Sequence, residues 1–271
     1  MNLEYTTDEF GKDLLLQDNG YQVMMEWEKP YMEACIDKLN PFGRVLEIGF
    51  GLGYSATHIQ TYENVKEHII IEYSPLVWEK MIPFLQKYPK AKLEKGKWQD
   101  VLPRLGNFDC IFFDDAPNVA ENLERNQHDF IKEILLDHTN IGARLTCYSS
   151  GEKIYIDESK VRLEEEEYKA DIPSNCKYVR HGKLHIPLFT KIDDVSKKDL
   201  ETFFKPSEAS HGQETIASLH FSNKELLFNT IQTLRHQGKS SKLNTLCELY
   251  LKNNTVDDRQ RRLVESLILN P

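Results

Sequence analysis

The sequence contains few cysteines, and none are paired at the spacing of a metal or redox motif. The five cysteines are odd in number and widely scattered: Cys35, Cys110, Cys147, Cys176 and Cys247. This pattern is typical of reduced thiols in a cytosolic protein, and it disfavours a disulfide framework or a zinc site. Nothing else in the sequence suggests a metal, a nucleophilic triad or a covalent intermediate.

Long hydrophobic runs and an excess of positive charge are also missing. No apolar stretch approaches the roughly 18 residues of a membrane span, and the start, MNLEYTTDEF, has no basic or apolar region of a signal peptide. The formal net charge is −9, which argues against a nucleic-acid partner. We therefore expect a soluble, cytoplasmic protein that binds neither membrane nor nucleic acid.

Short hydrophobic segments alternate with helical patterns over residues 44–148. Strands are predicted at 44–48, 68–72, 92–95, 110–113 and 143–148, with helices at 54–61, around 78–84 and at 130–136. Two closing strands are predicted at 176–179 and 186–190. Such alternation indicates an α/β fold with a doubly wound, mostly parallel sheet that is covered on both faces.

The two ends of the chain differ from this middle part. Residues 1–40 read as helical, with Thr7 as an N-cap and Pro30 near a helix start, and predict an N-terminal helical cover. The Glu164–Glu167 run reads as a solvated helical face. The predicted domains are 1–192 and 193–271, the latter a linker followed by a small α-helical C-terminal extension at 220–271, which is a candidate for homodimerisation or for binding a protein partner.

A glycine-rich turn directly follows the first predicted strand of the sheet. It reads Glu47-Ile-Gly49-Phe-Gly51-Leu-Gly53, and Tyr54 stands where a dinucleotide-binding motif would have its third glycine. The turn resembles motif I of class I S-adenosylmethionine-dependent methyltransferases. That resemblance implies a seven-stranded sheet, S-adenosyl-L-methionine as cofactor, Glu72 as the acid for the ribose hydroxyls, and Trp98 and Gln99 near the adenine.

Further segments resemble guanidinoacetate N-methyltransferases and fungal arginine N-methyltransferases over roughly residues 5–192. These are VMMEWEKPYM at 23–32, KGKWQDVLP at 95–103, FDCIFFDDAP at 108–117, CKY at 176–178 and IPLFTK at 186–191. The resemblance implies that Asp114 and Glu28 bind and orient a guanidino group, with Asp114 as proton acceptor. It also implies that Met24 and Met32 line the cofactor.

These residue types suit the chemistry of guanidino methylation. A guanidinium remains protonated at neutral pH, since its pKa lies above about 12. A site that methylates it must aim the planar group with carboxylates, which pair with it bidentately, and must accept a proton as the new bond forms. The predicted function is therefore S-adenosylmethionine-dependent N-methylation of a guanidino nitrogen by direct in-line transfer.

The sequence departs from the guanidinoacetate pattern beside the predicted acceptor site. Asp115 replaces a threonine, Ala116 replaces an aromatic residue, and His128 is displaced from the family's histidine, which leaves it either a general base or a helix-surface residue. The segment that begins at Tyr148 and Ser149 is shorter than the family's, whose backbone amides hold the substrate carboxylate. We count Asp115, Tyr148 and Ser149 among the substrate-binding residues, and the differences favour arginine or an arginine-containing peptide over guanidinoacetate.

Two other functions remain open from the sequence. One is an aminopropyltransferase-like enzyme, which uses a related cofactor and sheet but needs a second acid pair for a polyamine. The other is a catalytically silent methyltransferase-like scaffold whose C-terminal helices bind a partner. The intact glycine turn together with Glu72, Asp114 and Glu28 argues against the scaffold.

Overall fold

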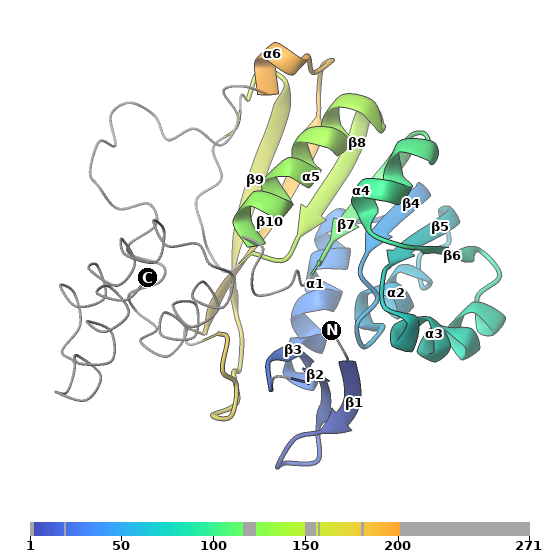
Figure 1. The fold of residues 1–271 in the computed structure, drawn as a ribbon. Helices are drawn as coiled ribbons and strands as arrows, with labels where there is room; N and C mark the ends of the chain where they lie inside the picture. Colours follow the sequence, from blue (N-terminus) through green and yellow to red (C-terminus); the bar gives the residue numbers. More distant parts are fainter. Residues whose placement is uncertain are drawn as a thin grey trace, which may run out of the picture. The chain divides into compact units, whose positions relative to one another are not determined.

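A computed structural model describes residues 3–18, 20–115, 123–149, 156, 158–179 and 182–200, without the side chains of 123–126 (Figure 1). These residues belong to one compact unit, Met1–Ala116 with Leu123–Lys205. The predicted linker from 201 onward and the predicted C-terminal helices lie outside the described residues. Within the described part, β10 runs to Lys191, and Val195 and Leu200 pack into the same core, so the core extends past the predicted boundary at 192.

The core of the unit is a seven-stranded sheet in the order β6-β5-β4-β7-β8-β10-β9. The strands are β4 (Gly43–Ile48), β5 (Val65–Glu72), β6 (Ala91–Lys95), β7 (Phe108–Phe113), β8 (Thr139–Cys147), β9 (Val161–Lys169) and β10 (Lys183–Lys191). Strands β4 to β8 pair in parallel, and β10 runs antiparallel to both β8 and β9. The predicted α/β fold with a mostly parallel sheet is confirmed.

Helices cover both faces of the sheet because its strands bury side chains on both sides. The helices are α1 (Lys29–Leu39), α2 (Tyr54–Ile59), α3 (Pro75–Lys87), α4 (Trp98–Val101), α5 (Leu123–Asp137) and α6 (Lys197–Leu200). Ile69 and Ile71 of β5 pack in one apolar cluster with residues of α4 and α5, whereas Ile70 between them packs with α3 on the other face. In Figure 1, α5 lies in front of β8 and β10. This alternation is the doubly wound arrangement that the buried strand segments predict.

The predicted N-terminal helical cover is wrong for residues 3–25. These form a three-stranded antiparallel sheet of β1 (Leu3–Thr7), β2 (Asp13–Gln17) and β3 (Gln22–Met25), and Thr7 ends a strand instead of capping a helix. Gly11 and Gly20 lie in the two connecting turns with φ of +72° and +81°, a conformation that glycine adopts at little cost. The turn signals around these two glycines outweigh the apolar run Leu14–Leu16. The predicted helix of residues 26–39 is confirmed as a 3₁₀ turn, η1 (Glu26–Glu28), followed by α1, with Pro30 in its first turn.

Two predictions near the end of the sheet are also wrong. Residues 164–167 lie in the edge strand β9, with all four glutamates exposed, and not on a helix. The charge run is solvated as expected, but its pairing with β10 decides its conformation. Residues 176–179 lie in the connection between β9 and β10 and form no strand, so β9 takes the place in the sheet that the sequence assigned to them.

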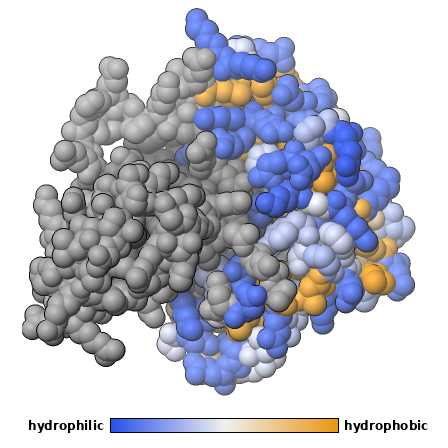
Figure 2. Space-filling model, in the orientation of Figure 1, coloured by the Kyte–Doolittle hydropathy of each residue, from blue (hydrophilic) through white to orange (hydrophobic). Residues whose placement is uncertain are grey.

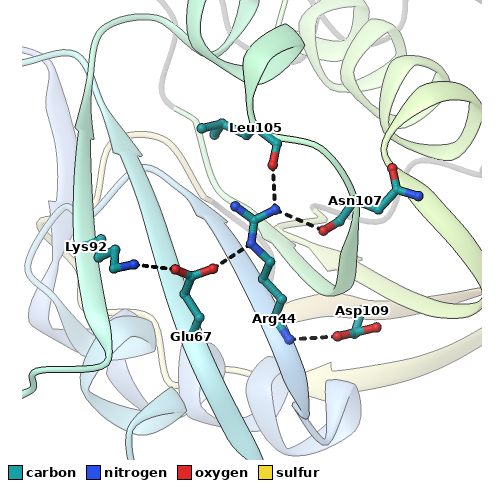
Figure 3. A network of polar contacts seen from close by, with 6 residues as sticks. All are labelled: Arg44, Glu67, Lys92, Leu105, Asn107 and Asp109. Atoms are coloured by element: carbon teal, nitrogen blue, oxygen red, sulfur yellow. Dashed lines mark hydrogen bonds and ion pairs between the residues drawn. The ribbon is translucent and has the colours of Figure 1, made fainter.

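The amino ends of four strands are tied together by Arg44 (Figure 3). Its Nε donates to Glu67 of β5 at 2.6 Å, and its Nη1 donates to the carbonyl oxygens of Leu105 and Asn107. Lys92 of β6 donates to the second oxygen of Glu67, and Asp109 of β7 accepts from the Arg44 backbone N–H. This network lies at the opposite end of the strands from their carboxyl ends, where open α/β sheets bind ligands.

The surface of the described part is mostly hydrophilic in the view of Figure 2. Its large exposed hydrophobic side chains come from separate elements and connections: Phe10, Ile82, Ile141 and Ile192. None of the described helices is long and apolar enough to cross a membrane.

Candidate active site

The glycine turn after β4 approaches two other elements so closely that side chains are excluded. Gly49, Gly51 and Gly53 have φ of +82°, +52° and +76°. A Cβ atom on Gly49 would lie 2.3 Å from the carbonyl oxygen of Asp114, and one on Gly51 would lie 2.6 Å from Sδ of Met24. The turn is therefore pressed against the end of β7 on one side and against β3 on the other, as a backbone that must touch a ligand requires.

Glu47 lies below this turn and is fully buried. Its Oε1 accepts a hydrogen bond from the Ser55 hydroxyl at 2.5 Å, and its Oε2 lies 3.0 Å from Nε2 of His68, which is also fully buried. Glu47 thus connects β4 to α2 and β5. The sequence assigned Glu47 to the cofactor. In the structure its carboxylate contacts Ser55 and His68, and contact with the cofactor stays a prediction.

Glu72 ends β5 beside the glycine turn, where the sequence predicts the acid for the ribose. Its Oε2 accepts from the Phe50 N–H at 3.1 Å and its Oε1 from the Ser74 N–H at 2.8 Å. Burial raises the pKa of Glu72, and these hydrogen bonds partly oppose the rise. Each oxygen of Glu72 thus already accepts from a backbone N–H inside the protein, and its assignment to the ribose hydroxyls stays a prediction.

Side chains from the N-terminal sheet cover the same turn. The Tyr5 hydroxyl on β1 donates to the carbonyl oxygen of Gly51 at 2.8 Å, and the Leu52 N–H points to Sδ of Met24 at 3.3 Å. Burial raises the pKa of Tyr5, and the nearby Glu72 carboxylate adds to this. The strands that replace the expected helices therefore contact the glycine turn through Tyr5 and Met24, and contact of Met24 with the cofactor stays a prediction.

Three other residues, Trp98, Gln99 and Met32, were assigned to the cofactor from the sequence. Trp98 follows β6 and is 4% exposed, with its ring edge-on to Phe130 at a centroid distance of 5.2 Å. Gln99 is exposed at the start of α4, and Met32 is fully buried among the apolar residues around α1. Trp98 and Met32 are thus core residues, and contact of these three side chains with adenine or methionine stays a prediction.

Glu28 is buried at the end of η1, immediately before α1, with only 3% of its surface exposed. Its Oε1 accepts from the Met25 N–H at 2.8 Å and from the hydroxyl of Tyr178. Burial raises the pKa of Glu28 to about 8, the negative charge of Asp114 contributes, and the two hydrogen bonds act in the opposite direction. Glu28 and Asp114 are therefore close enough to interact electrostatically, and their shared role at an acceptor stays a prediction.

Asp114 follows β7 at the carboxyl end of the sheet and is held by its own N–H, which donates to the Ile48 carbonyl oxygen at 3.1 Å. Burial, followed by the charges of Asp115 and Glu47, raises the pKa of Asp114 to about 7. The charge of Asp115 also contributes to the raised pKa of Glu72. Every charged group that shifts Glu28 and Asp114 is negative, and the arrangement is poised for a cation.

Tyr148 and Ser149 follow β8 on the other side of this acidic site. Burial, followed by the charges of Glu28 and Asp114, raises the pKa of Tyr148. The Tyr148 N–H donates to the Phe113 carbonyl oxygen at 3.1 Å, and the Ser149 N–H donates to the Tyr31 hydroxyl at 3.0 Å. Both backbone amides at the start of this segment are therefore bonded within the protein.

Comparison with known families agrees with this geometry. The family model of guanidinoacetate N-methyltransferase matches residues 5–154, more than half of the chain. The chain belongs to the guanidinoacetate N-methyltransferase family. With the family, the predicted class of S-adenosyl-L-methionine-dependent methyltransferases and the predicted cofactor are confirmed.

Curated relatives of this family member match a shorter region. Protein arginine N-methyltransferase 2 of Candida glabrata is 40% identical over 119 residues, which are 41% of this chain and 27% of that protein. The protein of the same name from Aspergillus oryzae is 34% identical over 39% of this chain and 27% of its own length. The matched part thus spans about a quarter of the length of these relatives.

Among solved structures, the SAH-bound methyltransferase PaMTH1 of Podospora anserina is 28% identical. The alignment covers 44% of this chain and 51% of that one, with a TM-score of 0.36.

His128 and Ala116, two departures from the family pattern, differ in what the structure shows. His128 lies half-buried on α5, and burial, with the nearby Lys132, lowers its pKa to about 4. Neutral at physiological pH, His128 is able to accept a proton, but its role as a base stays a prediction. Ala116 lies outside the described residues. The described residues hold no group of three or more His, Cys, Asp or Glu side chains arranged for a metal ion.

Sequence reasoning missed two hydroxyl groups of the site. Tyr178 falls within the Cys176-Lys-Tyr178 segment that resembles the family, so that resemblance was the signal that could have identified it. Tyr5 lies on a strand that was read as helix, and no motif distinguishes it. Both act through contacts with residues far away in the sequence, which local patterns do not report.

Proposed function

We propose that this chain transfers a methyl group from S-adenosyl-L-methionine to a guanidino nitrogen of an arginine side chain. The observation that carries the proposal is the pair of acids Glu28 and Asp114, whose pKa values are raised to about 8 and about 7. Burial and neighbouring negative charge disfavour the ionised form of both acids, and a bound cation would stabilise that form. A planar guanidinium is the cation that two carboxylates recognise best.

The residues divide the work of this reaction. The bound cofactor supplies an electrophilic methyl group on a sulfonium sulfur. Glu28 and Asp114 orient the guanidinium so that one nitrogen faces the cofactor side of the site, where the glycine turn and Glu72 lie. As the nitrogen bonds to the methyl carbon, the carbon–sulfur bond of the cofactor would break, with S-adenosyl-L-homocysteine as the leaving group. The nitrogen would lose one proton, which Asp114 would accept at its carboxylate. A carboxyl group whose pKa lies near 7 suits this transfer at neutral pH.

The backbone N–H groups of Tyr148 and Ser149 favour an acceptor that has no carboxylate close to its guanidino group. In guanidinoacetate the two groups are separated by one carbon, and the family resemblance assigns the carboxylate to amides of the segment that begins at Tyr148. Here the N–H groups of Tyr148 and Ser149 already donate to Phe113 and to Tyr31. Breaking such buried bonds costs free energy, so an arginine side chain, whose backbone lies farther away, fits better. The names of the curated relatives agree with this choice.

The proposal is tested by incubating the full chain with methyl-labelled S-adenosyl-L-methionine and separate acceptors: an arginine-containing peptide, free arginine, agmatine and guanidinoacetate. We expect label transfer to the peptide, and the product mass reports the number of methyl groups. Asp114→Asn should lower kcat/KM at least about 100-fold, since it removes the proton acceptor and one half of the clamp. Asp100→Asn, which changes an exposed carboxylate on α4, is the matched control and should retain activity.

Each result has a distinct meaning. Faster transfer to guanidinoacetate than to the peptide would refute the arginine acceptor while keeping guanidino methylation. Cofactor binding without transfer to any of the four acceptors would refute the proposed function. Equal activity of Asp114→Asn and the wild type would remove Asp114 from the mechanism.

A further inference from the structure

One oxygen of Glu28 is held by two donors, whereas the other has none among the described residues. Oε1 accepts from the Met25 N–H, which comes from β3, and from the Tyr178 hydroxyl, which comes from the connection between β9 and β10. No described group donates to Oε2. The carboxylate is therefore fixed in rotation, because turning it would break two bonds inside the protein. The plane and direction of Oε2 follow from the positions of Met25 and Tyr178.

The segment that carries Tyr178 is itself attached to the N-terminal sheet. The side-chain amide of Gln22 donates to the Asn175 carbonyl oxygen at 3.0 Å and accepts from the Lys177 N–H at 2.8 Å. Asn175 also donates through Nδ2 to Asp8 at 2.9 Å. Gln22 is 7% exposed, so this clamp forms with little competition from water. The Tyr178 ring lies beside the Trp27 ring at a centroid distance of 6.2 Å, which restricts its motion further.

The titratable groups that interact electrostatically with Glu28 come from several elements. They are Asp114 after β7, Tyr148 after β8, Tyr21 before β3, Tyr54 on α2, and Cys176 and Tyr178 in the connection between β9 and β10. None of these groups carries a positive charge. Stabilisation of ionised Glu28 inside the protein therefore comes from its two hydrogen bonds, and Tyr178 supplies the one that a side-chain substitution can remove.

We propose that Tyr178 is a positioning residue of the guanidino site, which with the Met25 amide fixes Oε1 of Glu28 and leaves Oε2 to accept a hydrogen bond from the acceptor. The proposal rests on the function proposed above for its role in the reaction. Its structural part, control of the Glu28 carboxylate by Tyr178, does not depend on that function. Tyr178 acts through Glu28 and touches no reacting atom.

The first test measures the Glu28 carboxyl group directly. The full chain is labelled with [δ-¹³C]glutamate, and the resonance that disappears in Glu28→Gln is assigned to Glu28. We expect it to titrate near pH 8 in the wild type and about one pH unit higher in Tyr178→Phe, because a donor to the ionised form is lost. The matched control is Tyr168→Phe. Tyr168 lies on β9 with its ring against Tyr31, and the substitution removes only its hydroxyl. It should leave the Glu28 resonance unchanged.

The second test measures the pH profile of kcat/KM with the arginine peptide. Guanidinium binding needs ionised acids, so kcat/KM rises with pH through the coupled titration of Glu28 and Asp114. In Tyr178→Phe this rise should move to higher pH, with a loss of roughly tenfold at pH 7 that shrinks above pH 9. A merely structural loss would lower kcat/KM by the same factor at every pH.

An unchanged Glu28 titration in Tyr178→Phe would overturn the proposal, and so would a uniform loss of kcat/KM. If the wild type methylates no guanidino acceptor, the proposed function fails, and the carboxyl titration still decides whether Tyr178 controls Glu28. If Tyr178→Phe does not fold, Gln22→Leu replaces it, since it releases the tyrosine segment and keeps the ring. A raised Glu28 titration in that variant supports the proposal, and an unchanged one refutes it.

Discussion

Glu28→Gln should make the ligand-free protein more stable as the pH rises, although it disables the proposed site. The glutamine side chain matches glutamate in shape, and its oxygen can still accept from the Met25 N–H and the Tyr178 hydroxyl. What disappears is the buried ionisable group. The folded-state pKa of Glu28 is raised from 4.5 to about 8, so the folded protein holds this proton more tightly than the unfolded chain does.

The sign and the size of the effect follow from that difference. The Glu28 carboxyl stabilises the fold fully below about pH 4.5, and this contribution is lost as the pH rises to about 8. At about 1.4 kcal/mol for each pKa unit, the full loss would be about 5 kcal/mol. Relaxation and water entry reduce this, and we expect about 2–3 kcal/mol. In a domain of this size the change corresponds to roughly 5–10 °C in Tm.

The assay is thermal unfolding of the wild type and Glu28→Gln in parallel from pH 5 to pH 9. The Tm difference should be small at pH 5, grow toward pH 8 in favour of the variant, and level off above it. Glu26→Gln is the matched control two residues away. Glu26 pairs with Lys12 at 2.8 Å, and its pKa is lowered, so its removal should destabilise the protein at neutral pH. A Tm difference for Glu28→Gln that does not change with pH would refute the reasoning.

Two further substitutions separate cofactor binding from stability. Glu72→Gln should weaken binding of S-adenosyl-L-homocysteine roughly 10-fold or more in calorimetry, because a hydroxyl bonded to a charged acceptor loses about 1.5–3 kcal/mol; unchanged affinity would contradict the ribose assignment. Arg44→Met should lower the free energy of unfolding by roughly 1–3 kcal/mol, since it leaves one oxygen of Glu67 and two carbonyl oxygens without their donor. The affinity for S-adenosyl-L-homocysteine should stay at the wild-type value. Unfolding in urea checks the second prediction, and a loss of cofactor affinity there would show that the two ends of the strands are coupled.

Local patterns in the sequence determined the main sheet and the candidate acids. Short apolar segments predict β4, β5 and β7, because a strand covered on both faces is largely apolar. The turn around Gly49 and Gly51 follows from residue type alone, since a positive φ and a close approach demand glycine. The positions of Glu72 and Asp114 follow in turn, because Glu72 ends a parallel strand and Asp114 directly follows one, so both lie at the carboxyl edge.

Local patterns failed where pairing partners decide the conformation. The segment from residue 3 to 25 has an apolar run that reads as helix, but its three strands pair with one another across two glycine turns. The acidic run of β9 is likewise extended because β10 lies beside it. A strand gains its hydrogen bonds from another segment, so its own sequence reports it less reliably than a helix, whose bonds are internal.

The electrostatic state of the site was decided by the tertiary structure alone. Tyr178 reaches Glu28 across 150 residues of sequence, and Tyr31 reaches the Ser149 amide across 118. The sequence identified Glu28 and Asp114 as acids, but not that burial and their shared negative charge raise their pKa values to about 8 and about 7. A pKa depends on the distance to every neighbouring charge and on the water that packing removes, and neither quantity exists until the chain has folded.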